Sequence, residues 1–142
     1  MVLSLKVYNC MMHLPLVPPE TGGILGEKGG VICSLYLDQK NQSKQRAIYS
    51  PDVKTLNKVI CRWAMDDICF AGMFHSHFPN QCTLSIDDKK YIESIFHSIP
   101  ISVESLFFPL VIPEIKILPF KAVRTESGIL INEDTIIIKR SV

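Results

Sequence analysis

Apolar residues recur at helical spacing between Asp52 and Asp66. Asp52 is a residue type that caps helices, and it stands directly before the repeating pattern. The apolar positions that fall on one face are Val53, Leu56, Ile60, Trp63 and Ala64. The pattern therefore predicts a helix over residues 53–66 whose apolar face packs on a sheet.

A second helix is predicted from Ser85 to about His97. Ser85 and Asp88 have the S-x-x-D spacing of a capping box, and residues 98–100 (Ser-Ile-Pro) end the helical pattern. Residues 2–14 are ambiguous between a short helix and a strand. Three prolines between this segment and Glu20 favour an extended approach to Glu20.

Strand-like segments surround these helices. A Gly-rich turn at residues 27–30 lies between two apolar runs, which predicts a hairpin. The run ICFAGMF favours a central strand buried on both faces, and it leads directly into His75. The polar stretch DQKNQSKQR predicts a surface loop. Further strands are predicted at residues 47–50, 105–112, 115–123, 128–131 and 135–139, with prolines typical of edges or bulges.

These elements predict an α+β (mixed α and β) fold in which a curved mixed β-sheet is flanked by two main helices. A chain of 142 residues fits one domain with a sizeable core, so we expect residues 1–142 to form a single domain.

Composition excludes several classes of protein. The 15 basic and 14 acidic side chains nearly balance, and no run of Lys or Arg is long enough to follow a phosphate backbone, so we expect no nucleic acid partner. Five cysteines without a C-x-x-C pair argue against a disulfide framework and a tetrathiolate zinc site. We found no export signal and no membrane span, which predicts a soluble cytoplasmic protein with reduced thiols.

One group of residues has the types and spacing of a metal site. His75 and His77 are two residues apart at a predicted strand end, so both rings point to the same face. Seven residues after His77, Ser85 opens a helix whose first turn holds Asp88. Two imidazoles and one carboxylate suit a first-row divalent ion, most often Zn²⁺. Three protein ligands leave one position open, where a bound water has a pKa near 7.

A water activated in this way still needs a base that does not bind the metal. Glu20, between two prolines and a Gly-rich strand, is the candidate. In the same scheme the Ser85 hydroxyl would donate to the oxyanion that forms during attack on a carbonyl.

The order of Glu20 in ETGGILG, then His75-Ser76-His77, seven residues, Ser85, two residues and Asp88 resembles the JAMM motif of the MPN/JAB zinc metalloprotease family. The resemblance covers most of the chain and implies a minimal prokaryotic-type JAB/MPN domain with a cytidine-deaminase-like fold. It implies one catalytic Zn²⁺ held by His75, His77 and Asp88, with Glu20 as general base and acid and Ser85 assisting the tetrahedral intermediate. The reaction implied is hydrolysis of a peptide or isopeptide bond, at the C-terminal tail of a ubiquitin-like or sulfur-carrier protein. Phe78 stands where the family commonly has proline.

Simpler interpretations and other functions remain open at this point. Ser85 and Asp88 can serve only as a helix cap, worth about 1 kcal/mol, and Glu20 can be a solvated charge. Cys82, in the loop between the ligands, is assigned no role. The alternative functions are a non-catalytic MPN-type interaction scaffold and a zinc hydrolase of a small amide. An extended tail could also bind by pairing with a sheet edge beside the metal.

Overall fold

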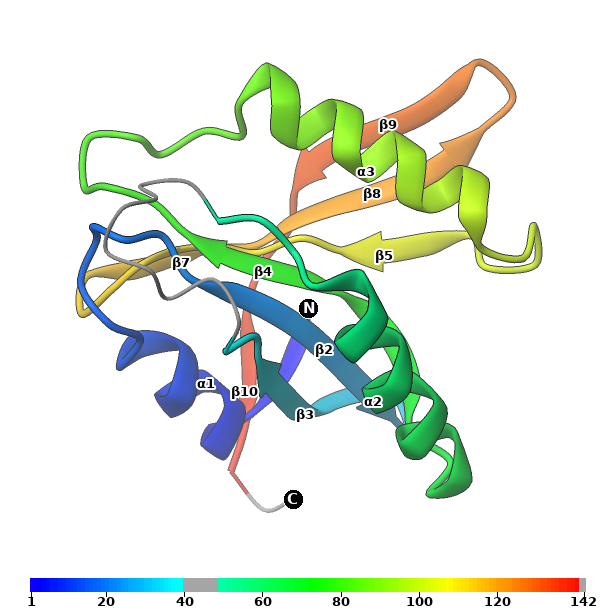
Figure 1. Cartoon of the computed structure of the whole chain (residues 1–142), viewed down its shortest axis with the longest axis horizontal. Helices are drawn as coiled ribbons and strands as arrows, with labels where there is room; N and C mark the ends of the chain where they lie inside the picture. The colour runs from blue at the N-terminus through cyan, green and yellow to red at the C-terminus, as the bar shows by residue number, and fades with distance from the viewer. Residues whose placement is uncertain (40–48, 141–142) are drawn as a thin grey trace.

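The computed structural model describes residues 1–39 and 49–140. In this part of the chain three helices form, α1 (Leu5–Met12), α2 (Val53–Met65) and α3 (Ile86–Ser98). The strands are β1 (Val2–Ser4), β2 (Gly22–Lys28), β3 (Val31–Leu37), β4 (Cys69–Ser76), β5 (Ser105–Phe107), β6 (Leu110–Ile112), β7 (Lys116–Leu118), β8 (Phe120–Thr125), β9 (Gly128–Glu133) and β10 (Ile137–Lys139). They build one curled mixed sheet in the order β10-β1-β3-β2-β4-β5-β8-β9, with β6 between β4 and β7 (Figure 1). The predicted α+β class is confirmed.

Most of the predicted elements are confirmed, and the differences are local. The ambiguous residues 2–14 contain both a strand and a helix, β1 and α1, so a third helix joins the two predicted ones. Prolines split the predicted strand 105–112 into β5 and β6, and the predicted strand 115–123 into β7 and β8. Residues 40–46 of the predicted loop and residues 47–48 of the predicted strand lie outside the described residues, and Tyr49 and Ser50 are not in a strand.

The two faces of the sheet carry separate apolar clusters because successive strand residues point to opposite sides. Leu25 of β2 and Phe74 of β4 face α1, whereas Ile24 and Met73 face α2 and α3. Helix α2 presents Leu56 and Val59 to this second face, and α3 presents Ile92 and Phe96. This alternation decides which side chains of β2 and β4 meet helix α3.

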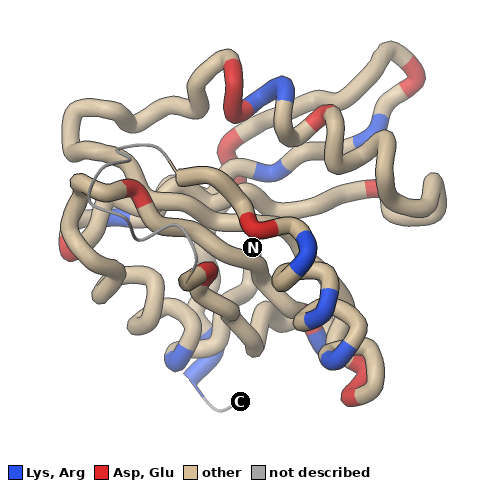
Figure 2. The backbone as a smooth tube through the Cα atoms, viewed as in Figure 1, with Lys and Arg blue, Asp and Glu red and all other residues tan. Residues whose placement is uncertain are grey.

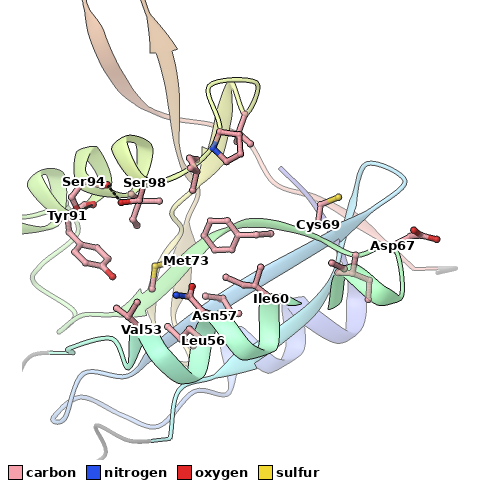
Figure 3. A pocket seen from close by; sticks show the side chains of 18 residues that line it. Val53, Leu56, Asn57, Ile60, Asp67, Cys69, Met73, Tyr91, Ser94 and Ser98 are labelled. Carbon is pink, nitrogen blue, oxygen red and sulfur yellow. Dashed lines mark hydrogen bonds between the residues drawn. The ribbon is translucent and has the colours of Figure 1, made fainter. Parts of the chain in front are cut away.

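Helices α2 and α3 do not close over the whole of this face. Between them lies the α2–α3 groove, a cavity of about 820 Å³ (Figure 3). Its floor is formed by Ile24, Phe70 and Met73, and its apolar walls include Leu56, Ile60 and Ile95. The outer face of α2 carries three basic residues, Lys54, Lys58 and Arg62, which are all exposed (Figure 2). Phe70, which lies in the strand predicted to be buried on both faces, is only half-buried and lines this groove.

Among the described residues, no helix is both long and apolar enough to cross a bilayer. All five cysteines lie in the described part of the chain and are free thiols, as the odd count and the absence of C-x-x-C predicted.

Gly72 in β4 is a position where the fold requires glycine. Its φ is +140°, and a Cβ there would overlap the backbone of Phe107 in the neighbouring strand β5. We expect Gly72→Ala to lower the free energy of unfolding by about 3 kcal/mol, through backbone strain and overpacking together. Urea unfolding followed by circular dichroism measures it. Gly128→Ala is the matched control, because Gly128 has φ +129° but open space around it, and equal losses for both variants would refute the steric part.

Candidate metal centre

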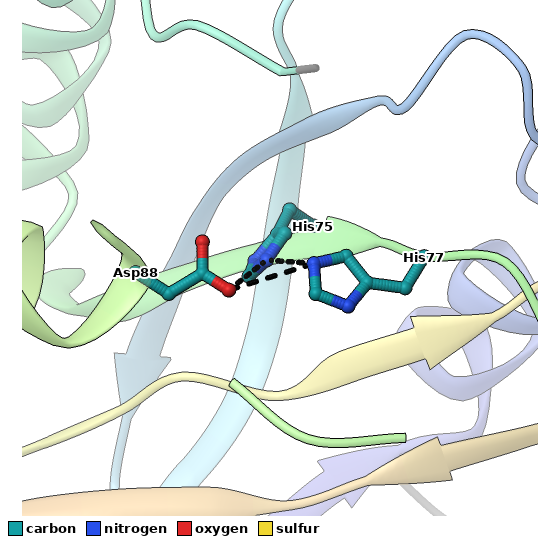
Figure 4. Close-up of side chains that lie close together, drawn as sticks. All are labelled: His75, His77 and Asp88. Atoms are coloured by element: carbon teal, nitrogen blue, oxygen red, sulfur yellow. Dashed lines mark hydrogen bonds and ion pairs between the residues drawn. The ribbon is translucent and has the colours of Figure 1, made fainter. Parts of the chain in front are cut away.

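Strand β4 and the residue that follows it place two imidazoles close together. His75 lies on the same face of β4 as Met73, and His77 continues this alternation directly after the strand ends. The two Nε2 atoms are 2.9 Å apart and the rings meet edge to face (Figure 4). Ring nitrogens at this separation repel each other unless a proton or a cation lies between them.

Asp88 completes the group from α3. The carboxylate oxygen Oδ2 of Asp88 is 3.2 Å from His75 Nε2 and 3.5 Å from His77 Nε2. The same oxygen accepts a hydrogen bond of 2.8 Å from the backbone N–H of Ser85, while Ser85 Oγ accepts from the N–H of Asp88 at 3.0 Å. The predicted capping box is therefore confirmed, and it holds the carboxylate in its orientation toward the two rings.

Strand register brings Glu20 to the same place. Strands β2 and β4 are antiparallel with Gly22 opposite His75, so continuing the register sets Glu20 opposite His77. Glu20 precedes β2, and its Oε2 lies 4.0 Å from His77 Nε2. The register shifts of β2 occur only beyond Leu25, so they leave the position of Glu20 unaffected. The structure thus brings together all four residues that the sequence assigned to the metal and the base.

Hydrogen bonds from neighbouring residues orient these groups. His77 Nδ1 lies 3.2 Å from the carbonyl oxygen of Gln81, a contact that fixes the ring with Nε2 toward the site. Glu20 Oε1 accepts from the backbone N–H of Tyr49 at 3.3 Å. The Tyr49 hydroxyl in turn donates to Asp38 Oδ2 at 3.1 Å, and Asp38 is buried. The sequence does not indicate a role for Tyr49 or Asp38, because only the folded chain brings Tyr49 beside Glu20 and Asp38 beside Tyr49.

Ser76, between the two histidines, faces the opposite side of the sheet and is fully buried. Its Oγ accepts from the backbone N–H of Thr21 at 2.8 Å, and its own N–H donates to the carbonyl oxygen of Thr21 at 2.8 Å. These bonds tie the residue after Glu20 to the residue before His77. The alternation of strand side chains could have predicted this inward direction, although not the partner.

Charges in the group are mutually dependent. Burial alone would lower the pKa of His77, but its contact with Asp88 and the charges of Glu20 and Asp88 raise that pKa above the usual value. Burial likewise opposes ionisation of Asp88, yet the contacts with His75 and His77 hold the pKa of this carboxyl well below its usual range. The pocket therefore favours a positive charge between an ionised carboxylate and two imidazoles.

The donor set fits a divalent metal ion. His75, His77 and Asp88 each offer one ligand atom, and within the described residues they form the group that could hold an ion. Bonds of roughly 2.0–2.2 Å to a tetrahedral ion place neighbouring ligand atoms about 3.3 Å apart, and the three observed separations bracket this value. Borderline-soft nitrogen with one carboxylate oxygen is a typical catalytic zinc set, whereas Ca²⁺ and Mg²⁺ prefer oxygen alone.

The site is open to solvent and to substrate-sized space. A cavity of about 370 Å³ is lined by His75, Asp88, Tyr49 and Tyr91 among others. The Ser85 side chain is exposed and keeps its hydroxyl hydrogen free to donate, because the cap uses Oγ as an acceptor. Cys82 lies apart from the ligand group, with its Sγ donating to the carbonyl oxygen of Pro79 at 3.4 Å.

Ser76→Ala tests the link between the two strands. We expect a loss of 1–3 kcal/mol in the free energy of unfolding, because the buried N–H of Thr21 loses its acceptor. Metal content, measured by elemental analysis, should stay near that of the wild type since both histidines remain. Ser34→Ala, with a half-buried hydroxyl on β3, is the control, and equal stability of both variants would contradict the role of Ser76.

Comparisons with known proteins show a shared fold and indicate no function. No protein-family model matches this sequence, and no curated protein matches it. Among solved structures, the solution structure of protein DSY2949 from Desulfitobacterium hafniense is similar over 100% of this chain and 95% of that chain. Its TM-score is 0.66 and its sequence identity is 20%, so the likeness shows a shared fold alone.

Proposed function

We propose that this chain is a cytoplasmic zinc metalloprotease of the JAMM/MPN type that hydrolyses a peptide or isopeptide bond. One observation carries the proposal: Glu20, His75, His77 and Asp88 converge from three separate segments with the spacing of a metal site and an adjacent base. A structural zinc site would close the ion with four ligands. Three ligands, together with a neighbouring carboxylate that is not one of them, instead favour hydrolysis.

His75, His77 and Asp88 would hold the ion. Zinc bound there supplies a Lewis acid that polarises a carbonyl and lowers the pKa of water to about 7. Asp88 brings the negative charge that balances the cation, and the capping box keeps its carboxylate in place. Both imidazoles would have to be neutral to bind an ion, so binding would release any proton held between their Nε2 atoms.

Glu20 would move the proton. Its carboxylate is held by the Tyr49 N–H on one oxygen, which leaves Oε2 directed toward His77 and the candidate ion. From this position Oε2 can accept a proton from the attacking water and deliver it to the leaving nitrogen. The exposed Ser85 hydroxyl would donate a hydrogen bond to the oxyanion on the substrate.

The substrate would be a protein tail, from a ubiquitin-like or sulfur-carrier protein. We expected such a tail to pair with a sheet edge beside the metal, and β4 offers no such edge at His75. Gly22 of β2 pairs with His75 on one side and Leu110 of β6 pairs with it on the other. We therefore propose that a tail would reach the ligands across the face of the sheet that α2 and α3 cover.

The test begins with metal content and ends with cleavage. Purified protein should hold one zinc per chain and should cut fusions that end in ubiquitin-like or sulfur-carrier tails. Removing zinc with a chelator should abolish cleavage, and adding zinc back should restore it. If the protein held stoichiometric zinc and hydrolysed small amides but cleaved no tail, the substrate would be a small amide and not a protein tail. Partner binding that survives loss of zinc would favour a scaffold.

A further inference from the structure

The α2–α3 groove is an apolar trough that the proposed chemistry does not use. Helices α2 and α3 form its walls, and the sheet forms its floor (Figure 3). Of the positions that line it from α2, Val53 is 54% exposed, which is unusual for a large apolar side chain beside other apolar groups. Small exposed residues, Ala64 on α2 and Ser94 on α3, keep the trough wide.

The groove runs into the candidate metal centre. Met73 and Tyr91 line both the groove and the smaller cavity that contains His75 and Asp88. Met73 precedes His75 by two residues on the same face of β4, a distance of about 7 Å along a strand. Tyr91 follows Asp88 by three residues on α3, which places both side chains on one side of that helix. Anything bound in the groove can thus continue directly to the ligands.

Length and volume match a short piece of extended polypeptide. Val53 and Ala64 both line the groove, and eleven residues of helix separate them by about 16 Å. That distance corresponds to roughly five residues of extended chain. A volume of about 820 Å³ is at the upper end of the range for ligand pockets, and this lining selects apolar side chains.

The α2 rim of the groove is basic. On α2, Lys54 and Lys58 are one residue beyond the lining positions Val53 and Asn57, so they follow the groove along its outer edge. On α3 the charges are mixed, because Lys90 lies between Asp87 and Glu93, so the positive charge is confined to the α2 side. Arg62 extends the row on α2, which gives this edge a positive field over about two helical turns (Figure 2). The charges complement acidic residues beside an apolar segment.

We infer that the α2–α3 groove binds an apolar segment of about five residues of the polypeptide substrate, flanked by acidic side chains, and leads it to His75 and Asp88. This inference deepens the proposed function and rests on it. Recognition here uses side chains rather than strand pairing, because the floor strands β2 and β4 are already paired with their neighbours on both sides. The groove therefore determines which sequence is cut, whereas the metal centre determines the reaction.

Binding is measured on Glu20→Gln protein without added metal, so that it depends on neither zinc nor turnover. The probes are three fluorescein-labelled peptides: Leu-Ala-Phe-Ala-Leu flanked by glutamates, the same core flanked by lysines, and a serine core flanked by glutamates. We expect the glutamate-flanked apolar peptide to bind at least tenfold more tightly than either other peptide, by fluorescence anisotropy.

Two double variants locate the site. Ala64→Gln with Ser94→Gln narrows the groove at exposed helical positions, and Lys54→Glu with Lys58→Glu reverses one rim. Each should weaken binding at least tenfold. Lys6→Glu with Lys116→Glu makes the same change in charge on α1 and β7 and should leave binding unchanged. Circular dichroism confirms that each variant is folded.

The outcomes separate the groove from the proposed reaction. Selective peptide binding without zinc or cleavage would overturn the hydrolase and leave the groove assignment standing. Cleavage that the groove variants do not alter, or equal binding of all three peptides, would overturn the groove assignment. So would a dimer, detected by light scattering, that the Ala64→Gln and Ser94→Gln changes dissociate, because the occupant would then be a second copy of the chain.

Discussion

Replacing Glu20 with glutamine is expected to lower kcat by about 10²–10⁴-fold while the protein keeps its metal. Glutamine has nearly the same shape and can still accept the hydrogen bond from the Tyr49 N–H. It cannot accept a proton, so the water would lose its base and the leaving nitrogen its acid. Zinc content and KM should change little, because Glu20 is not among the three grouped ligands.

The control for this experiment is Glu27→Gln, which changes the same residue type at the far end of β2. That variant should retain full activity. A Glu20→Gln protein within threefold of the wild-type kcat would remove Glu20 from the mechanism, and parallel loss of zinc would assign it a ligand role instead.

Loss of both imidazoles is expected to abolish metal binding and activity together. In His75→Ala with His77→Ala, Asp88 would be left alone with the hydrogen bond from Ser85. Mutation of residues that only orient a ligand costs 10–100-fold in metal affinity, so removal of two ligands should exceed about 100-fold. Elemental analysis and a competition titration with a chromophoric chelator measure this loss, and cleavage should fall to background.

The chain supplies its own control for this double variant. His13 and His97 are the other two histidines, and both are exposed. His13→Ala with His97→Ala removes the same number of imidazoles and should bind zinc as the wild type does. If both double variants retained one zinc per chain, the ion would lie elsewhere and the proposed centre would be wrong.

Local sequence patterns predicted the helices and the strand on which the site residues lie. Periodicity found α2, and the S-x-x-D spacing found both α3 and the capping box that orients Asp88. The two-residue period of a strand predicted that His75 and His77 point to one side. Glu20 was assigned mainly from a resemblance, yet the β2–β4 register provides an independent physical reason for its position.

Features made by distant segments could not be predicted in this way. Tyr49 reaches Glu20 across 29 residues, and the groove needs α2, α3 and two strands at once. The pairing of β6 beside His75 likewise arises from tertiary packing, so the sequence predicted a central strand here without indicating which strand lies beside His75. Helix α1 was ambiguous because it has only eight residues and follows a three-residue strand without a break.

The pairing of Thr21 with Ser76 has a consequence for how this protein can change over time. A single residue inserted or deleted within residues 20–25 or 72–77 would turn the side chains on one side of the change to the other face of the sheet. Glu20 would then face α1 while the histidines faced α3. The irregular step after Leu25 can absorb a length change without this inversion, since it lies beyond the paired block. Length variation among descendants of this sequence is therefore expected after residue 25, and not between Glu20 and that step.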